Sequence, residues 1–168
     1  MKITTIVLVT LTTLASVVHA APAMMSAEWT AQACDAWNQD DALTTGLGEH
    51  WIKNDANRGY KIIHLYRTEC GEESKTELKI MERDGKAVCV YGGAVQNTRM
   101  NLSVDYTLHA TTERWEEIGA GQYGPIRAVM FGRLKFTGPK MEALSVAEPF
   151  KAFMHLPARI PGDKACPT

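Results

Sequence analysis

The sequence has almost no excess charge of either sign. Its 168 residues carry 18 Lys and Arg against 19 Asp and Glu, a formal net charge of −1. A protein that is held on a phosphate backbone or on an anionic membrane by its overall charge needs a strong positive field. We therefore expect no nucleic-acid partner, and at most transient contact with a membrane.

The motifs of common catalytic and cofactor sites are also missing. The chain contains no H-E-x-x-H, no C-x-x-C and no G-x-S-x-G pattern. G-x-G-x-x-G occurs at 119–124, but a helical pattern precedes it instead of the strand that a dinucleotide site needs. His64 and His109 fall within strand patterns. We expect no metal, no cofactor and no catalytic residue, although a hydrolase whose site assembles in space stays an alternative.

A long uncharged run opens the chain. After Lys2, residues 3–27 contain no charged side chain, and Val18 and Ala20 suit the −3 and −1 positions of a signal-peptide cleavage site. The alternative is a membrane anchor, because the run is long enough to span a bilayer. Five threonines and Pro22 favour cleavage. We predict a signal peptide at 1–20 and export to a bacterial periplasm or to the medium.

Four cysteines follow the predicted cleavage site. Four cysteines allow three full pairings, and an exported chain meets an oxidising compartment. Cys70 lies in a Glu-Cys-Gly-Glu turn, where a bridge to another element is easy to place. Cys89 lies in a strand pattern and has the character of a small buried hydrophobic residue. If a disulfide forms, we expect it between Cys34 and Cys70.

Residue periodicity predicts an α+β fold with one antiparallel-rich, five-stranded sheet and helices on one face. Ser26 is a predicted helix N-cap, and Asp84-Gly85 predicts a type I′ hairpin. Helices are expected at 27–37, 41–45, 112–118, 126–131 and 140–156, and strands at 60–68, 76–83, 86–91, 100–110 and 133–137. We divide the mature chain into a short segment at 21–25, one domain at 26–156 and a Pro-containing tail at 157–168.

Two details of this prediction concern the C-terminal third. Gly132 and Gly138 bound a short strand in which Leu134 and Phe136 share one side, since side chains alternate along a strand. Pro149 interrupts the last helical stretch, which predicts two short helices or one kinked helix. The same third is dense in Met and Phe, which indicates either an ordinary core or an adaptable wall around an apolar guest.

One segment resembles a known family. Asp105-Tyr106-Thr107-Leu108 matches a D-x-T-L strand, and Ala128 to Gly138 (AVMFGRLKFTG) matches an A-x-M-x-G-[RK]-[LI]-K-[FV]-x-G block. An apolar helical stretch follows the block, and the hairpin at Asp84-Gly85 precedes it. In this arrangement, from about Ser26 to Leu156, the chain resembles the SCP-2 (sterol carrier protein 2) domain.

The resemblance implies a small α+β domain that holds fatty acyl chains, sterols, phospholipids or quinone-type lipids in an apolar tunnel without transforming them. It implies no cofactor, and it leaves the oligomeric state open. About ten buried methylenes, at about 0.8 kcal/mol each, give roughly 8 kcal/mol, so micromolar binding needs a closed or lidded cavity. A scaffold module with a filled tunnel is the alternative. The expected lining residues are Met130, Phe131, Leu134, Phe136, Met141, Leu144, Phe150, Phe153 and Met154.

Overall fold

The computed structural model describes residues 20–167, so the predicted signal peptide lies outside the described residues except for Ala20. The strands are β1 (Tyr60–Arg67), β2 (Thr76–Arg83), β3 (Lys86–Ala94), β4 (Tyr106–Ala110) and β5 (Lys135–Thr137). The helices are α1 (Ala27–Asn38), α2 (Asp41–Thr44), α3 (Thr112–Gly119), α4 (Pro125–Met130), α5 (Lys140–Ser145), α6 (Ala147–Met154) and α7 (Leu156–Arg159). Two 3-10 turns, η1 (Thr68–Cys70) and η2 (Glu72–Ser74), join β1 to β2.

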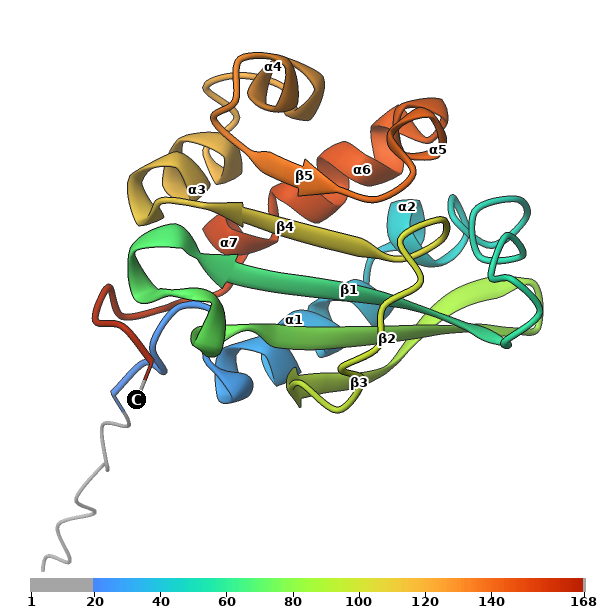
Figure 1. Cartoon of the computed structure of the whole chain (residues 1–168), viewed down its shortest axis with the longest axis horizontal. Coiled ribbons are helices and arrows are strands. Elements are labelled where there is room, and N and C mark those ends of the chain that lie inside the picture. The colour runs from blue at the N-terminus through green and yellow to red at the C-terminus, as the bar shows by residue number, and fades with distance from the viewer. Residues whose placement is uncertain (1–19, 168) are drawn as a thin grey trace, which may run out of the picture.

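The five strands form one mixed sheet in the order β3-β2-β1-β4-β5 (Figure 1). This confirms the predicted α+β fold with a mostly antiparallel sheet. One pair differs from the purely antiparallel pattern, because β4 runs parallel to β1, with Ile63 opposite Tyr106 and Arg67 opposite Ala110. The reason is the segment 95–105, which leaves β3 at one end of the sheet and carries the chain back along it before β4 begins. We call residues 95–105 the crossing segment.

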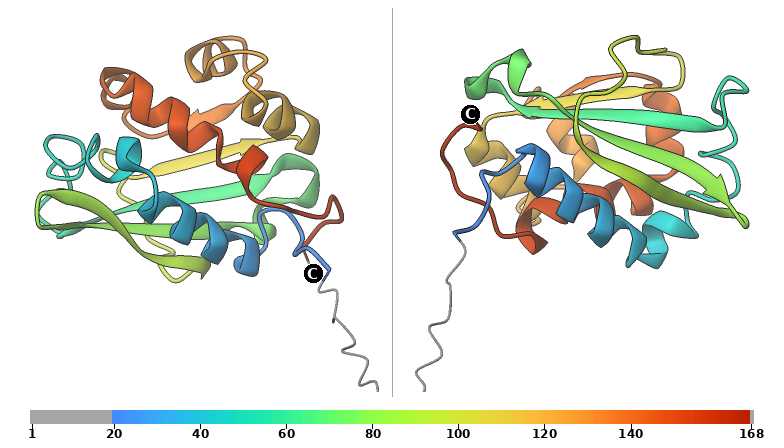
Figure 2. Two further views of the ribbon diagram at one scale, coloured as in Figure 1. Left: turned by 180° about the vertical axis from the view of Figure 1, so that it is seen from behind. Right: turned by 90° about the horizontal axis from the view of Figure 1, so that it is seen from below.

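The helices lie on one face of the sheet, as predicted, and the crossing segment lies on the other (Figure 2). Alternate residues of β1 point to the two faces: Ile63 and Leu65 are buried towards the helices, in the same core as Trp37 and Phe153. Within residues 20–167, no helix is both long enough and apolar enough to cross a membrane.

The crossing segment corrects the predicted strand 100–110. The strand begins only at Tyr106, and Leu102, expected on the core side, is 48% exposed. Asn101 instead starts a turn, since its carbonyl accepts hydrogen bonds from the N–H groups of Val104 (2.9 Å) and Asp105 (2.8 Å). The buried Asp105 carboxylate accepts from the N–H of Asn101 and from both terminal nitrogens of Arg58. These charge-assisted bonds satisfy the carboxylate and hold the turn in place of a strand.

Other local predictions are confirmed. The Ser26 hydroxyl accepts a hydrogen bond from the N–H of Trp29 at 3.2 Å, which caps α1. Asp84 and Gly85 both have positive φ, 52° and 76°, as a type I′ turn between β2 and β3 requires. The strand predicted at 133–137 is shorter than expected, because β5 begins at Lys135 and the N–H groups of Arg133 and Leu134 bond to the Ala128 carbonyl of α4. Leu134 is nevertheless buried and the Lys135 and Thr137 side chains are exposed, in keeping with the predicted alternation.

The cysteine pairing differs from the predicted one. Cys34 bonds to Cys89 rather than to Cys70, and Cys70 bonds to Cys166. The first bridge forms because α1 packs on β3, where a Cβ at Gly92 would lie only 2.7 Å from the Cβ of Cys34. Asn38, at the end of α1, also exchanges two 2.8 Å hydrogen bonds with the backbone of Cys89.

The second bridge ties down the C-terminal tail. The buried Arg67 donates hydrogen bonds to the carbonyls of Lys164 (2.8 Å) and Ala165, which brings Cys166 to the turn that holds Cys70. The tail also meets the start of the described chain, since Ala23 and Asp163 form an isolated parallel bridge. The two ends of the domain are therefore fastened to each other.

The last helical stretch breaks at Val146 rather than at Pro149. Val146 has φ −114° and ψ 49°, outside the helical region, and separates α5 from α6. Pro149 lies in the first turn of α6, where the N–H that proline lacks has no intrahelical acceptor to lose. Proline there is tolerated and does not end the helix.

Candidate functional site

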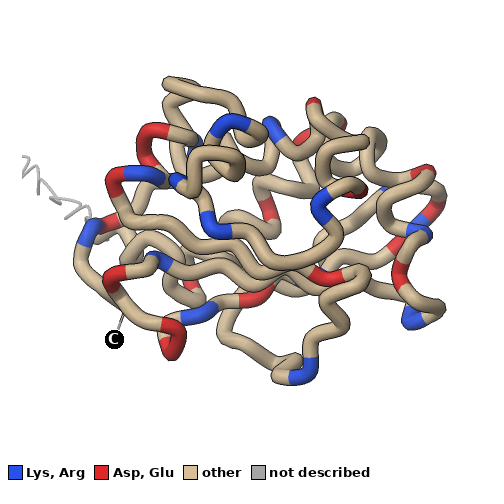
Figure 3. The backbone as a smooth tube through the Cα atoms, turned by 45° about the horizontal axis from the view of Figure 1, so that its top comes forward, with Lys and Arg blue, Asp and Glu red and all other residues tan. Residues whose placement is uncertain are grey.

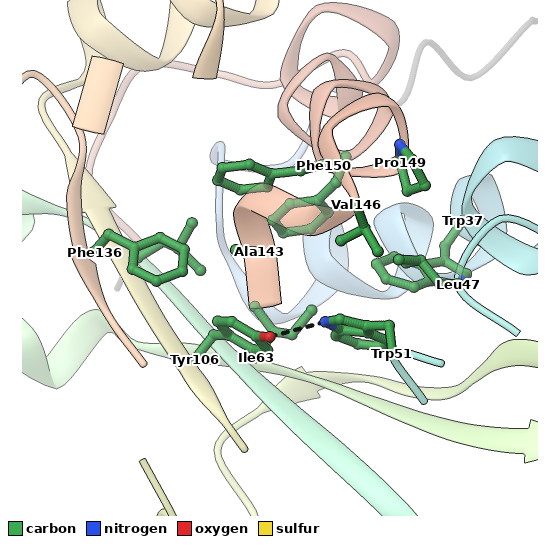
Figure 4. A pocket seen from close by; sticks show the side chains of 12 residues that line it. Trp37, Leu47, Trp51, Ile63, Tyr106, Phe136, Ala143, Val146, Pro149 and Phe150 are labelled. Carbon is green, nitrogen blue, oxygen red and sulfur yellow. Dashed lines mark hydrogen bonds between the residues drawn. The ribbon is translucent and has the colours of Figure 1, made fainter. Parts of the chain in front are cut away.

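A small apolar cavity lies between the helices and the sheet (Figure 4). Its volume is about 30 Å³, which is space for roughly one water-sized molecule. The sheet supplies one wall and α6 the opposite one. Its lining residues are Trp37, Leu47, Trp51, Ile63, Tyr106, Leu108, Phe136, Ala143, Val146, Pro149, Phe150 and Phe153.

Aromatic rings make up much of this wall. The rings of Trp51 and Tyr106 stack at 5.9 Å between centroids, and Tyr106 meets Phe136 edge-on at 5.6 Å. Phe136 in turn meets Phe150 edge-on at 5.8 Å. Such tilted and offset arrangements are favourable for aromatic pairs. The chain of rings runs from the loop before β1, through β4 and β5, to α6.

A polar cluster lies at one edge of the cavity and joins α5 to the sheet. Lys61, on the helix-facing side of β1, is fully buried, and its Nζ donates to Glu142 Oε2 at 2.7 Å and to the Trp51 carbonyl at 3.1 Å. The Tyr106 hydroxyl donates to the same carboxylate and accepts from Trp51 Nε1 at 2.9 Å. Asn54 Nδ2 donates to Glu142 Oε1 at 2.6 Å. Glu142 is thus the polar residue that fixes α5 to the sheet.

Burial governs the titration of this cluster. Desolvation lowers the pKa of Lys61, although the hydrogen bond and charge of Glu142 partly oppose it. Desolvation, helped by the nearby Glu142 carboxylate, raises the pKa of Tyr106 well above its ordinary value. The Tyr106 phenol therefore stays protonated and remains a donor to Glu142. Lys61 also lies 4.5 Å from the Trp51 ring centroid, a cation–π contact that partly replaces lost water.

An open groove adjoins the cavity. It has a volume of about 360 Å³ and lies between α4, α5 and α6. Its lining residues are Ile126, Val129, Met130, Phe136, Lys140, Ala143, Leu144 and Phe150. Phe136, Ala143 and Phe150 line the cavity as well as the groove. These three side chains are the partition between the two spaces.

The nine residues expected to line a tunnel are distributed over several places. Phe136, Phe150 and Phe153 line the cavity, and Met130 and Leu144 line the groove. Leu134 and Met154 are buried in the core, Met154 beside a second small gap near Trp29 and Trp115. Phe131 and Met141 are 68% and 78% exposed and line neither space.

Several residues of the site escaped the sequence analysis. Trp37, Leu47, Trp51 and Tyr106 line the cavity from the N-terminal and central parts of the chain. Only tertiary packing brings them to α6, so local periodicity carried no signal for them. For Lys61 the sequence did carry a signal. Lys61 lies at the same alternating positions of the strand as Ile63 and Leu65, which places a lysine on an apolar face.

His64 and His109 lie away from the cavity, on the opposite face of the sheet. His64 is buried with its Nε2 3.2 Å from Glu77 Oε2, beneath the crossing segment. His109 stacks on Tyr66 at 4.4 Å, and its Nδ1 is 2.9 Å from the Thr68 hydroxyl oxygen. In residues 20–167 no group of three or more His, Cys, Asp or Glu side chains is placed to hold a metal ion.

Comparison with known proteins identifies the family. The model of the SCP-2 sterol transfer family matches residues 53–151, more than half of the chain. The chain belongs to this family. The matched SCP-2 range includes Lys61, Tyr106, Glu142 and Phe150, whereas Trp37, Leu47 and Trp51 precede it. A search of curated protein sequences gave no match.

Solved structures are similar in fold. A crystal structure of sterol carrier protein 2 has 16% sequence identity and a TM-score of 0.52, and the alignment covers 82% of this chain and 99% of that one. A solution structure from Thermus thermophilus, described as possibly a sterol carrier protein, has 15% identity and a TM-score of 0.49, with coverages of 87% and 96%. At these identities the likeness concerns the fold.

Proposed function

We propose that this SCP-2 family member binds and carries a hydrophobic ligand, with an acyl chain or ring system lodged between β5, α5 and α6, and does not transform it. One observation carries the proposal. An aromatic-lined apolar cavity is separated from an open apolar groove only by Phe136, Ala143 and Phe150. If the two phenyl rings swing aside, the spaces join into one tunnel. Fatty acids, sterols, phospholipids and quinones are the ligand classes we would test.

The volumes imply that ligand entry needs movement. Pockets for small molecules usually measure about 300–1,000 Å³. The groove reaches this range, whereas the cavity is more than tenfold smaller. Helix α5 is suited to move, because it is six residues long and buries only Ala143. Displacing α5 would require Glu142 to leave Lys61, so the polar cluster would act as the latch of the tunnel.

The small volume of the cavity also supports the alternative of a scaffold module with a filled tunnel. Native mass spectrometry of delipidated protein, offered members of each ligand class in turn, separates the two. The carrier proposal expects one-to-one complexes with at least one class. Absence of uptake from all four would favour the scaffold. Loss of an enzymatic activity on substitution of His64 or His109 would instead revive the hydrolase alternative.

We propose further that the protein is exported and that the mature chain begins at Ala21. Two disulfides in one small domain support this proposal, because such bonds persist in oxidising compartments. N-terminal sequencing of protein from its native host should begin at Ala21. Recovery of a chain beginning at Met1 or Lys2 in the membrane fraction would favour an anchored protein.

A further inference from the structure

The near-zero net charge conceals a local excess of positive charge. Between Glu117 and Glu142 the chain has four basic residues and no acidic one. Arg127, Lys135 and Lys140 are exposed, while Arg133 is half-buried and lies over the Tyr123 ring at 4.4 Å. This stretch comprises α4, β5 and the start of α5. Figure 3 shows the positions of the Lys and Arg residues along the backbone.

The same stretch exposes apolar side chains. The described residues include six large hydrophobic side chains that are exposed, and five of them belong to α4, α5 or the residue after α4. The sixth is Leu102, on the crossing segment. The five are Ile126 (40% exposed), Met130 (76%), Phe131 (68%), Met141 (78%) and Leu144 (38%). We call these five, with Arg127 and Lys140, the α4–α5 face. Lys135 is not part of it, because it pairs with His109 and points to the opposite side of the sheet.

The parts of this face lie close together. Helices α4 and α5 lie on the same side of the sheet's β5 edge (Figure 1). Ile126, Met130, Leu144 and the stem of Lys140 line the open groove described above. The Arg127 guanidinium lies 5.8 Å from the Phe131 ring centroid, so cation and apolar ring share one surface.

Acidic groups near the face are few and mostly engaged. Glu142 turns inwards to Lys61, Asn54 and Tyr106. On α3, Glu117 pairs with Arg114 at 2.6 Å and Glu116 with Lys164 at 2.7 Å. Glu148, on α6, is the exposed carboxylate of the adjoining helix, and the exposed Lys151 lies one turn after it. Within the described part of the chain, the face therefore presents apolar groups among cations that form no ion pair.

We propose that the α4–α5 face docks on an anionic lipid bilayer. Met130, Phe131 and Met141 enter the interfacial layer, and Arg127 and Lys140 meet the lipid headgroups. Apolar side chains set among Lys and Arg are the usual make-up of surfaces that lie in a membrane interface. A second copy of the chain fits less well, because a two-fold contact would bring the same cations face to face. The docking proposal depends only on the residues of this surface. The further step, in which a lipid passes from the membrane through the groove to the cavity, rests on the proposed function.

The test is co-flotation of the mature chain with vesicles of phosphatidylcholine alone and of phosphatidylcholine with phosphatidylglycerol. We expect binding to the anionic vesicles that weakens as salt screens the charges. Met130→Ser with Phe131→Ser should lower the partition coefficient at least about tenfold. Leu102→Ser, which removes an exposed apolar side chain elsewhere, is the matched control and should leave it unchanged.

A second group of variants tests whether the cations of the face bind anionic headgroups. Replacing Arg127 and Lys140 together with Gln should abolish the preference for phosphatidylglycerol, since each cation near an anionic surface contributes about fivefold. Replacing Arg83 and Lys86 with Gln gives the same change in net charge elsewhere on the surface and should preserve the preference. All variants alter exposed residues, and circular dichroism verifies their fold.

Three outcomes would overturn the docking proposal: no vesicle binding by the parent chain, equal binding by the parent and the two α4–α5 variants, or a parent dimer that Met130→Ser with Phe131→Ser dissociates. Failure of the proposed function shows separately. Uptake of a monomeric ligand added from ethanol, measured without vesicles, tests the cavity and does not depend on docking.

Discussion

The two edges of the sheet are held very differently. At the β3 edge, α1 buries Trp29, Ala33 and Trp37, and a disulfide joins Cys34 to Cys89. At the β5 edge, a strand of three residues is flanked by α4 and α5, whose buried residues are Pro125, Ala128 and Ala143. Buried tryptophans and a covalent bond give one edge its stability, whereas small side chains and one polar cluster hold the other. Segments of low local stability are those that open for ligands.

The largest expected effect concerns the β3 edge. Replacing Cys34 and Cys89 together with Ser removes a bridge that closes 55 residues of chain. Loop entropy predicts a loss of about 4 kcal/mol in the free energy of unfolding, measured by urea titration. Met130→Ser, at the β5 edge, should change it by less than about 0.5 kcal/mol because the side chain is exposed. Equal losses in the free energy of unfolding from the two replacements would show that the two edges of the sheet do not differ in stability.

The next effect concerns the polar cluster that holds α5. Glu142→Gln removes the negative partner of the buried Lys61 and should cost about 3 kcal/mol, since a buried charge is left unpaired. Lys61→Met with Glu142→Gln removes both charges and should restore most of that loss. The double variant should also take up ligand faster, because α5 is no longer fixed to Lys61. Stability as low in the double variant as in Glu142→Gln would show that the ion pair is not what holds α5.

A smaller effect concerns the partition between cavity and groove. Phe150→Trp enlarges a ring that lines both spaces. It should weaken the binding of long acyl chains about tenfold and leave the binding of short chains unchanged. Phe150→Ser should weaken all chain lengths alike. Displacement of a fluorescent fatty acid across a chain-length series measures both. If Phe150→Trp weakened the binding of all chain lengths equally, the end of the bound acyl chain would not lie at Phe150.

The smallest effect is a pH dependence of the free energy of unfolding. It concerns Glu77 on β2, the strand that pairs with β3. Burial alone would raise the pKa of Glu77, but hydrogen bonds from His64 and Asn97 outweigh it, so its pKa lies below the ordinary value of about 4.3. Stability from Glu77 is therefore complete above that ordinary value and is lost as pH falls through the folded-state pKa. Urea titrations from pH 6 to pH 3 should show a shallower loss in Glu77→Gln than in the parent. Glu113→Gln, at an exposed position of α3, is the control.

Local signals predicted most of the fold and tertiary contacts explain the exceptions. The Ser26 cap and the Asp84-Gly85 turn depend on neighbouring residues alone, so the sequence was sufficient to find them. The disulfides were predicted wrongly because only the packing of α1 on β3, and the capture of the tail by Arg67, bring the right cysteines together. The strand expected from Met100 was too long, because the alternation there competes with the hydrogen bonds of Asp105.

The candidate site was accessible to sequence reasoning only in part. The C-terminal apolar density pointed to Phe136, Phe150 and Phe153, which line the cavity. Phe131 and Met141 belong to the same apolar stretch, but their side chains are exposed to solvent. Amino-acid composition cannot distinguish a residue that lines a cavity from one that is exposed on the surface. The Lys61–Glu142 pair spans 81 residues of chain and follows from the sheet bringing β1 beneath α5.

The most direct test of the carrier proposal is photo-crosslinking. A fatty acid bearing a diazirine near its methyl end would be bound to delipidated mature protein, irradiated and mapped by peptide mass spectrometry. The proposal predicts one label per chain, on the peptides that contain Trp37, Phe136, Phe150 or Phe153, with labelling suppressed by unlabelled fatty acid. Labels confined to the crossing segment or to the β2–β3 hairpin, or no competable label at all, would contradict it.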